Sequence, residues 1–238
     1  MTYTIYDFPD CLSVFHGIIR EELIQLPVRH YAPKDALITE GTSSKKELYF
    51  LLHGVCAGEE KRKTGRNENL YIKYPKGYFL GLLEIISPKT DQRLITICAQ
   101  TDVYALIIDG KTLLRWQCQY PAIYNTIIAH VLTFHFQMQR LFLSCTFHAP
   151  YPACIYYLCT LYEIYRDSCY GKDYSQKVKI LDSREEIRHY LAKDVRTINR
   201  ILNQLKSQEL ISVMKGKIHI DQNQYLALRA LLEEQDLD

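Results

Sequence analysis

The stretch DSREEIRHYLAKDVRTINRILNQL, residues 182–205, contains the clearest structural pattern in the sequence. Ser183 is followed three residues later by Glu186, a capping box that is typical of the first turn of a helix. Asp194 is placed to cap a second helix. Apolar residues with helical spacing run through both segments, namely Ile187, Leu191, Ile198, Ile201, Leu202 and Leu205. The short Ala192-Lys193 link between the segments predicts a helix-turn-helix.

The second predicted helix presents a polar face. Its exposed positions are expected to be Val195, Arg196, Asn199, Arg200 and Asn203. Arginine and amide side chains suit guanine and adenine edges in a major groove. Residues 183–217 contain eight Lys or Arg and four Asp or Glu. Residues 221–238 contain one Arg and five Asp or Glu. The positive charge therefore accompanies the motif, and we favour DNA binding over a structural helical pair with solvated arginines.

A predicted hairpin follows the two helices. The short runs Leu210–Val213 and Lys217–Ile220 flank Lys215-Gly216, a dipeptide that is typical of a tight turn. We expect this hairpin to form a wing beside the helices. Capping residues, apolar spacing, local charge and the hairpin all agree on one interpretation, a winged helix-turn-helix that binds DNA.

The segment from residue 28 to residue 108 has the sequence pattern of β-strands rather than of helices. It consists of short β-rich runs separated by glycine, proline or charged residues: Ala36–Ile38, Glu47–Leu52, Leu70–Tyr74, Leu94–Ala99 and Val103–Ile108. Short strands at regular spacing predict an antiparallel sandwich or barrel rather than a βαβ sheet.

A long helix is predicted between these two parts, because Pro121 suits a first turn and the apolar period continues to about Phe147. One stripe along it recurs at alternating spacings of three and four: Tyr124, Ile127, Val131, Phe134, Met138, Leu141 and Cys145. Two interpretations fit this stripe, packing on its own domain and pairing with a second copy. We favour a homodimer seam, because the strict period of 3.5 is narrower than the usual globular face. The proline-rich stretch 148–152 ends the helix.

The composition sets limits on the class of protein. The chain has 238 residues, of which 47% are hydrophobic and 24% charged, so it is globular rather than disordered. A net charge of +2 confines any DNA-binding surface to a local patch. The eight cysteines include no CxxC pair and no signal peptide is evident, which favours reduced thiols and a cytoplasmic protein. The uncharged stretch 116–139 is interrupted by polar residues, so we expect no membrane span.

The order of parts resembles the Crp-Fnr family of bacterial transcription regulators. The resemblance covers nearly the whole chain and is strongest from Ser183 to Ile211. Upstream, residues 37–41, 48–54 and 77–81 are similar to the strands and glycine turns of the family's β-roll. The resemblance implies an α+β chain with a jelly-roll-like antiparallel β-roll sensor (residues 1–119), a long dimerisation helix (residues 120–148) and a C-terminal winged helix-turn-helix (residues 149–238).

The resemblance also implies how the chain would bind DNA. A homodimer would insert two recognition helices into successive major grooves of a two-fold operator, with RNA polymerase as a further partner. Arg200 matches a position for base contact, Arg196 stands where many members carry an acid, and Val195 offers only apolar contact. Three residues match positions that contact phosphate: Ser183, Arg184 and Thr197. The residues expected at the dimer interface are Ile127, Val131, Phe134, Met138, Leu141 and Cys145.

The effector positions depart from the family's cyclic-nucleotide site. Where relatives have a Gly-Glu turn and an Arg-Ser pair, this chain has Gly81-Leu82 and Arg93-Leu94. Arg93 is retained as a candidate anion ligand, but the ribose carboxylate and the hydroxyl are replaced by leucines. The positions that would meet the purine are Met138 and Gln139. Because these buried polar partners are missing, we expect an effector other than cyclic AMP, or none.

Other functional classes have little support. The sequence shows no catalytic triad, no phosphate-binding GxxxxGK motif, no N-terminal cysteine cluster and no pair of ligands with metal spacing, so we expect neither an enzyme nor a metal or haem cofactor. The leading prediction is a DNA-binding transcriptional regulator, switched by an unidentified small molecule or by none. The alternative is an interaction module that keeps the fold without allostery.

Overall fold

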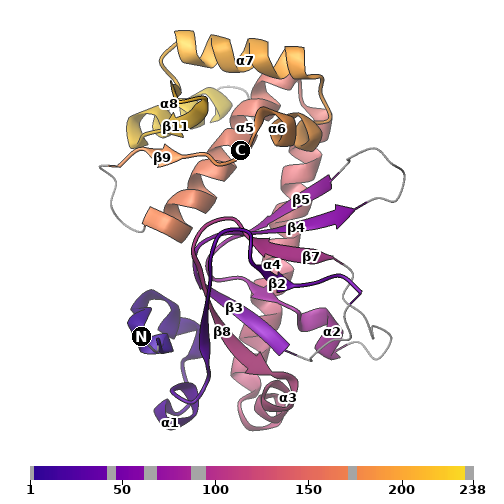
Figure 1. Ribbon diagram of the computed structural model, residues 1–238, viewed down its shortest axis with the longest axis vertical. Coiled ribbons are helices and arrows are strands. Elements are labelled where there is room, and N and C mark those ends of the chain that lie inside the picture. Colours follow the sequence, from indigo (N-terminus) through magenta and orange to yellow (C-terminus); the bar gives the residue numbers. More distant parts are fainter. Residues whose placement is uncertain (1–2, 42–46, 62–68, 87–94, 171–175, 234–238) are drawn as a thin grey trace. The chain divides into compact units, whose positions relative to one another are not determined.

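The structure is a computed structural model that describes residues 3–41, 47–61, 69–86, 95–170 and 176–233 (Figure 1). It divides into two compact units, each of which is described by itself. The first unit comprises residues 1–61 and 72–135, and the second comprises residues 62–71 and 136–238. Helices and antiparallel strands are both abundant, which confirms the predicted α+β class.

Two four-stranded sheets form the first unit. The strand orders are β1-β8-β3-β6 and β2-β7-β4-β5, and the pairs β1–β8, β3–β8, β3–β6, β2–β7 and β4–β7 are antiparallel. The strand bounds are β1 Val28–Tyr31, β2 Ala36–Ile38, β3 Glu47–His53, β4 Cys56–Lys61, β5 Asn69–Tyr74, β6 Phe79–Leu80, β7 Thr96–Ala99 and β8 Val103–Asp109. The five β-rich runs predicted from the sequence correspond to β2, β3, β5, β7 and β8.

One tight turn in these sheets requires glycine. Gly54, between β3 and β4, has a φ of +85°, a left-handed conformation that side chains with a Cβ rarely adopt. A Cβ placed there would lie 2.2 Å from the carbonyl oxygen of Asp102. The close approach of two backbone segments at this point therefore explains the glycine.

Helical segments surround the sheets of the first unit. They are two 3₁₀ helices, Ile5–Asp7 and Pro9–Phe15, followed by α1 Arg20–Leu23, α2 Leu82–Ile86, α3 Gly110–Gln119 and the start of α4. Asp109 caps α3 by accepting hydrogen bonds from the amides of Lys111 and Thr112. Of these helices only α4 is predicted from the sequence, because each of the others is too short to show a clear apolar period.

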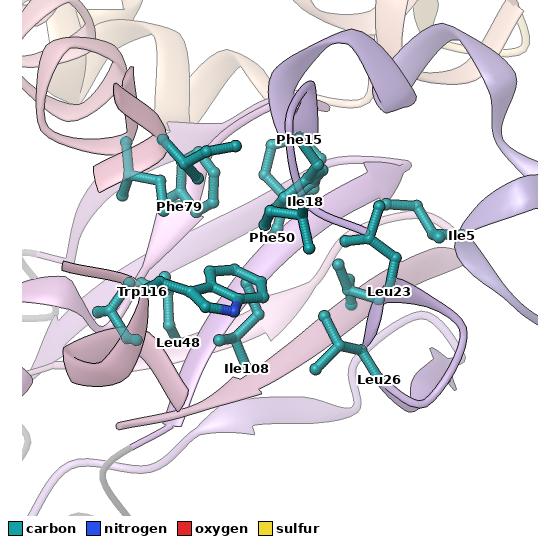
Figure 2. Packing of buried hydrophobic residues seen from close by; sticks show 14 of the residues in the cluster. Ile5, Phe15, Ile18, Leu23, Leu26, Leu48, Phe50, Phe79, Ile108 and Trp116 are labelled. Atoms are coloured by element: carbon teal, nitrogen blue, oxygen red, sulfur yellow. The ribbon is translucent and has the colours of Figure 1, made fainter. Parts of the chain in front are cut away.

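The core of the first unit is completed by its N-terminal segment (Figure 2). Phe15, from the second 3₁₀ helix, lies 5.0 Å from Phe50 of β3 and 6.3 Å from Trp116 of α3, measured between ring centroids. Ile5 is fully buried and belongs to the same cluster, as do Leu48 and Ile108. The segment before β1 is thus an integral part of this core.

Helix α4 extends from Pro121 to Phe147, as predicted, but the predicted dimer seam requires correction. Ile127, Phe134, Leu141 and Cys145 are already buried by their own chain, with at most 9% of their surface exposed. Val131 and Met138 are half-buried. A stripe that is covered within one chain is unavailable to a second copy, so the alternative interpretation, packing on its own domain, describes this face of the helix.

Aromatic rings cover Phe134. Its ring centroid lies 4.0 Å from that of Tyr78 and 5.8 Å from that of Tyr74, and the two tyrosine rings stack at 5.1 Å. Burial raises the pKa of Tyr78 to about 12, so its hydroxyl is protonated at neutral pH. This cluster of three aromatic side chains holds the middle of α4 against the first unit's own strands.

Different apolar residues remain exposed on α4. They are Leu132, Phe136, Phe142, Leu143 and Phe147, with between 50% and 76% of their surface accessible. Leu132, Phe136, Leu143 and Phe147 are separated by four, seven and four residues, so they lie along one side of the helix. We call these four residues the exposed α4 stripe.

The second unit is mainly helical. After α4 it contains α5 Pro150–Tyr165, a π-helix Arg166–Tyr170, β9 Val178–Lys179, α6 Arg184–Leu191, α7 Val195–Ser207, β10 Ser212–Met214, β11 Lys217–Ile220 and α8 Gln222–Glu233. The three strands form an antiparallel sheet with the order β10-β11-β9. Helices α6 and α7 are the two helices predicted from the sequence, whereas α8 was not predicted.

A buried carboxylate joins α5 to the start of α6. Asp182 is 4% exposed and accepts hydrogen bonds from the hydroxyls of Tyr165, at 2.8 Å, and Tyr157, at 3.3 Å. Burial and the neighbouring carboxylate raise the pKa of Tyr165 well above its usual value, so its hydroxyl remains a donor. Tyr157 also stacks on Tyr190 of α6 at 4.5 Å. This network fixes the residue that precedes the first cap of the helix-turn-helix.

We expect Tyr165→Phe to lower the free energy of unfolding by about 1.5–3 kcal/mol, the usual value of a hydrogen bond to a charged group. The substitution keeps the ring and removes one donor from a buried carboxylate. Urea denaturation measures the change, and Tyr156→Phe, on the same helix but half-buried, is the matched control. Equal stability of the two variants would show that the hydrogen bond to Asp182 contributes nothing.

The eight cysteines all lie in the described residues and form no disulfide; Cys11, Cys56, Cys145, Cys154 and Cys159 are buried. Burial raises the pKa of Cys154 and Cys159 to about 12, so these thiols are uncharged. Within the described part of the chain, no helix is both long and apolar enough to span a bilayer.

Candidate nucleic-acid interface

The helix-turn-helix has the caps that its sequence predicts. The hydroxyl of Ser183 accepts a hydrogen bond from the amide of Glu186 at 3.1 Å, and the Glu186 carboxylate accepts one from the amide of Ser183 at 2.7 Å. Asp194 caps α7 by accepting from the amide of Thr197 at 2.9 Å. Hydrogen bonds from the hydroxyl and the amide of Thr197 lower the pKa of the Asp194 carboxyl group, so it is ionised at neutral pH. Both helix starts are therefore fixed by local hydrogen bonds.

Ala192 makes the turn between the two helices. It has a φ of 51° and a ψ of 40°, the left-handed conformation that commonly ends a helix. The amides of Ala192 and Lys193 then donate to the carbonyl oxygens of His189 and Arg188, in the last turn of α6. Glycine adopts this conformation more readily than a residue with a Cβ, so the position would suit glycine better than alanine.

We expect Ala192→Gly to raise the free energy of unfolding by about 0.5–1 kcal/mol. A left-handed conformation costs a residue with a Cβ about 1–2 kcal/mol, and part of this gain is offset by the greater backbone entropy of glycine in the unfolded chain. Urea denaturation measures the difference. Ala227→Gly, at an exposed position in α8, is the control and is expected to destabilise by about 0.5–1 kcal/mol. If both variants lost stability, the left-handed turn would be contradicted.

Packing turns the polar side of α7 outward. Ile198, Ile201, Leu202 and Leu205 are at most 3% exposed and form the inner side of the helix. The residues exposed on the opposite side are Arg196, Arg200 and Asn203, together with Ser207 at the end of the helix. In Figure 1, α7 lies at the outer edge of the second unit. We call Arg196, Arg200 and Asn203 the α7 outer face.

Two of the residues predicted to contact DNA form a hydrogen bond with each other. The Arg184 guanidinium, at the first position of α6, donates from Nη1 to Oδ1 of Asn199 on α7 at 2.8 Å. Arg184 is exposed, whereas Asn199 and Val195 are half-buried. Asn199 and Val195 therefore lie at the flank of the outer face rather than at its centre.

The hydroxyls of Ser183 and Thr197 serve the helix caps. Thr197 donates from Oγ1 to the Asp194 carboxylate at 2.6 Å, while Ser183 accepts within its capping box. Both residues lie at helix starts, where backbone amides carry partial positive charge. The structure thus gives each residue a structural role in the free protein.

The two lysines of the wing have different surroundings. Lys215 and Gly216 both have positive φ, 49° and 76°, which is the pattern of a type I′ hairpin turn. Lys215 is exposed at this turn. Lys217 instead donates from Nζ to the carbonyl oxygen of Leu181 at 2.6 Å. The sequence predicts the hairpin but does not distinguish the two lysines, because the difference depends on a tertiary contact.

The residues predicted to bind an effector are only partly described. Gly81 has a φ of +88° and follows β6, while Leu82 is 5% exposed and belongs to the core of the first unit. Arg93 and Leu94 lie outside the described residues. On α4, Met138 is half-buried and Gln139 is exposed. Because Leu82 serves the hydrophobic core, the position that would have held a ribose carboxylate offers no polar group.

Comparisons with known proteins agree with this architecture. Residues 28–117 match the cyclic nucleotide-binding domain family. No curated protein sequence matches the chain.

Solved structures cover most of the chain. FixK2 from Bradyrhizobium japonicum is similar with a TM-score of 0.66 at 15% identity, over 87% of this chain and 96% of that one. A Crp/Fnr family transcriptional regulator from Thermus thermophilus has the same TM-score at 16% identity, over 87% and 98%. The c-di-GMP responsive global regulator CLP from Xanthomonas campestris reaches 0.63 at 15% identity, over 90% and 99%. The expected resemblance to Crp-Fnr regulators is confirmed at the level of the fold.

Proposed function

We propose that this chain, which has the fold of the Crp-Fnr transcription regulators, binds double-stranded DNA in a sequence-specific manner in the cytoplasm. The observation that carries the proposal is the α7 outer face, where Arg196, Arg200 and Asn203 point away from a well-packed helix-turn-helix. Arginine suits guanine and asparagine suits adenine in the major groove. The exposed Lys215 at the wing tip adds positive charge beside the helix pair.

Contacts to phosphate would fix the register of α7 on the duplex. Arg184 is exposed and lies at the start of α6, beside the caps made by Ser183 and Thr197. Phosphate contacts position a protein on DNA without recognising sequence, whereas groove contacts specify it. Val195 would contribute apolar contact, for instance to a thymine methyl group. The preferred half-site would thus depend mainly on Arg196 and Arg200.

We infer that the chain acts as a homodimer through the exposed α4 stripe, in place of the buried seam. Leu132, Phe136, Leu143 and Phe147 follow one side of the helix and are at least 50% exposed. Pairing two such helices removes this apolar surface from water. A two-fold dimer would place two recognition helices in successive major grooves, so the operator is expected to be a palindrome.

We propose that the β-roll of the first unit binds an effector other than cyclic AMP, or binds none. The buried Leu82 leaves the nucleotide ribose without a carboxylate partner. If an effector binds near Arg93, its action would be a shift in population toward the arrangement of the two DNA-binding domains that fits the operator. DNA affinity that no small molecule changes would favour an effector-independent regulator.

Selection of bound genomic fragments by the purified chain tests the proposal. We expect enrichment of a two-fold motif, and repeating the selection with a small-molecule cell extract tests the sensor. If no fragment is enriched with or without extract, DNA recognition is wrong and the interaction-module alternative takes its place.

A further inference from the structure

The hydrogen bond between Arg184 and Asn199 connects the two helices of the motif on their exposed side. A guanidinium group has donors and no acceptor, so the amide atom that faces it must be the oxygen. The 2.8 Å distance from Nη1 to Oδ1 is that of a charge-assisted hydrogen bond. Asn199 therefore uses its acceptor on a neighbouring side chain of the same protein.

The position of Asn199 on α7 agrees with this use. Successive residues of a helix are rotated by about 100°. Arg196, Arg200 and Asn203 are centred opposite the buried residues, whereas Asn199 is turned toward the flank on which Leu202 is buried. Arg184 reaches the same flank from α6. Asn199 is thus better placed to contact α6 than to point into a groove.

An asparagine that recognises adenine uses both the oxygen and the NH₂ group of its side-chain amide. Its oxygen accepts from N6 and its NH₂ group donates to N7. Because the oxygen of Asn199 is directed at Arg184 on the flank of α7, the amide is not oriented for this bidentate contact. The guanidinium has five N–H donors in a fixed fork, so one bond to Asn199 leaves the others available for a phosphate.

We propose that Asn199 is a positioning residue, which holds the Arg184 guanidinium ready for a DNA phosphate and does not itself distinguish bases. This inference rests on the proposed function and changes the role that sequence analysis gave to Asn199. Its effect on binding would pass through Arg184, so the two residues would act on affinity and salt dependence as one unit.

A double-mutant cycle tests the proposal. Fluorescence anisotropy is measured for the wild type, Arg184→Ala, Asn199→Ala and the double variant, on the selected operator and on a scrambled duplex, over a series of salt concentrations. We expect Arg184→Ala to weaken binding to both duplexes and to reduce the salt slope by about 1 for each phosphate that the protein no longer neutralises. Asn199→Ala is expected to weaken binding to both duplexes in the same proportion and to have no further effect once Arg184 is alanine.

A second pair of variants separates positioning from base recognition. Asn199→Asp keeps the acceptor for Arg184 but loses the NH₂ donor, and Asn203→Asp puts the same charge on the outer face one turn later. We expect Asn199→Asp to weaken binding to the operator and to the scrambled duplex in the same proportion, because its carboxylate competes with phosphate for the Arg184 guanidinium. Asn203→Asp should in addition lower the preference for the operator. Thermal melting confirms that each variant is folded.

Two outcomes would overturn the inference. One is a change of preferred base at a single operator position in Asn199→Ala with an unchanged salt slope, which would make Asn199 a base-contacting residue. The other is an Asn199→Ala effect that persists in full when Arg184 is absent. Failure of the wild type to bind any duplex would instead overturn the proposed function, and this inference with it.

Discussion

The double variant Arg196→Ala, Arg200→Ala is expected to lose most of its preference for the operator while it remains folded. Both side chains are exposed at the α7 outer face, so their removal creates no cavity. A good bidentate contact to a base edge is worth about 1–3 kcal/mol of discrimination. Removal of one such contact lowers the ratio of specific to non-specific affinity by roughly 5-fold to 150-fold, and the effects of two are expected to multiply.

Anisotropy titrations on the operator and on a scrambled duplex measure this ratio. Arg188→Ala is a control for the loss of an arginine outside the α7 outer face, because the Arg188 guanidinium is hydrogen-bonded to Glu185 of its own helix at 2.7 Å. It is expected to leave the ratio close to that of the wild type. If the double variant kept the wild-type ratio, α7 would not be the recognition helix.

Phe136→Asp and Phe134→Asp are expected to have opposite consequences, although the residues are only two positions apart. Phe136 is 66% exposed on α4, so its variant should fold and become a monomer. Phe134 is 9% exposed against Tyr74 and Tyr78. Truncation of a buried aromatic side chain costs about 3–5 kcal/mol, and burial of a carboxylate adds to that cost. Phe134→Asp should therefore unfold the first unit.

Light scattering gives the oligomeric state, and urea denaturation gives the stability of each variant. The monomeric Phe136→Asp variant is also expected to lose its advantage on a two-fold site over a half-site, because only one recognition helix then engages. A Phe136→Asp variant that remained a dimer would exclude the exposed α4 stripe as the interface. A stable, monomeric Phe134→Asp variant would restore the seam first predicted from the sequence.

The sequence was sufficient where structure depends on local interactions. The capping box of Ser183 and Glu186 and the cap at Asp194 involve residues three apart, so the two helices of the motif could be located from the sequence alone. The turn at Lys215-Gly216 is similarly local. The candidate DNA-binding surface is the part of the molecule that sequence patterns predict best.

The sequence did not predict which partner covers an apolar surface when more than one could pack on it. The period of the predicted seam is the same whether Phe134 packs on a second copy or on Tyr74 and Tyr78 of its own unit. Only the fold decides which of the two covers it. The same reason explains why Asn199 was predicted to contact DNA, since its bond to Arg184 joins positions fifteen residues apart.

The N-terminal 3₁₀ helices have a consequence for how the chain folds during synthesis. Ile5 and Phe15 belong to a cluster that also contains Trp116 and Ile127. The first unit can close its core only after about a hundred further residues have left the ribosome, and such distant contacts make folding slow. In the second unit, Tyr162 of α5 stacks on Tyr225 of α8, which lies 63 residues later in the sequence. This distance is shorter than the one that separates Ile5 from Trp116, so we expect the second unit to fold faster than the first.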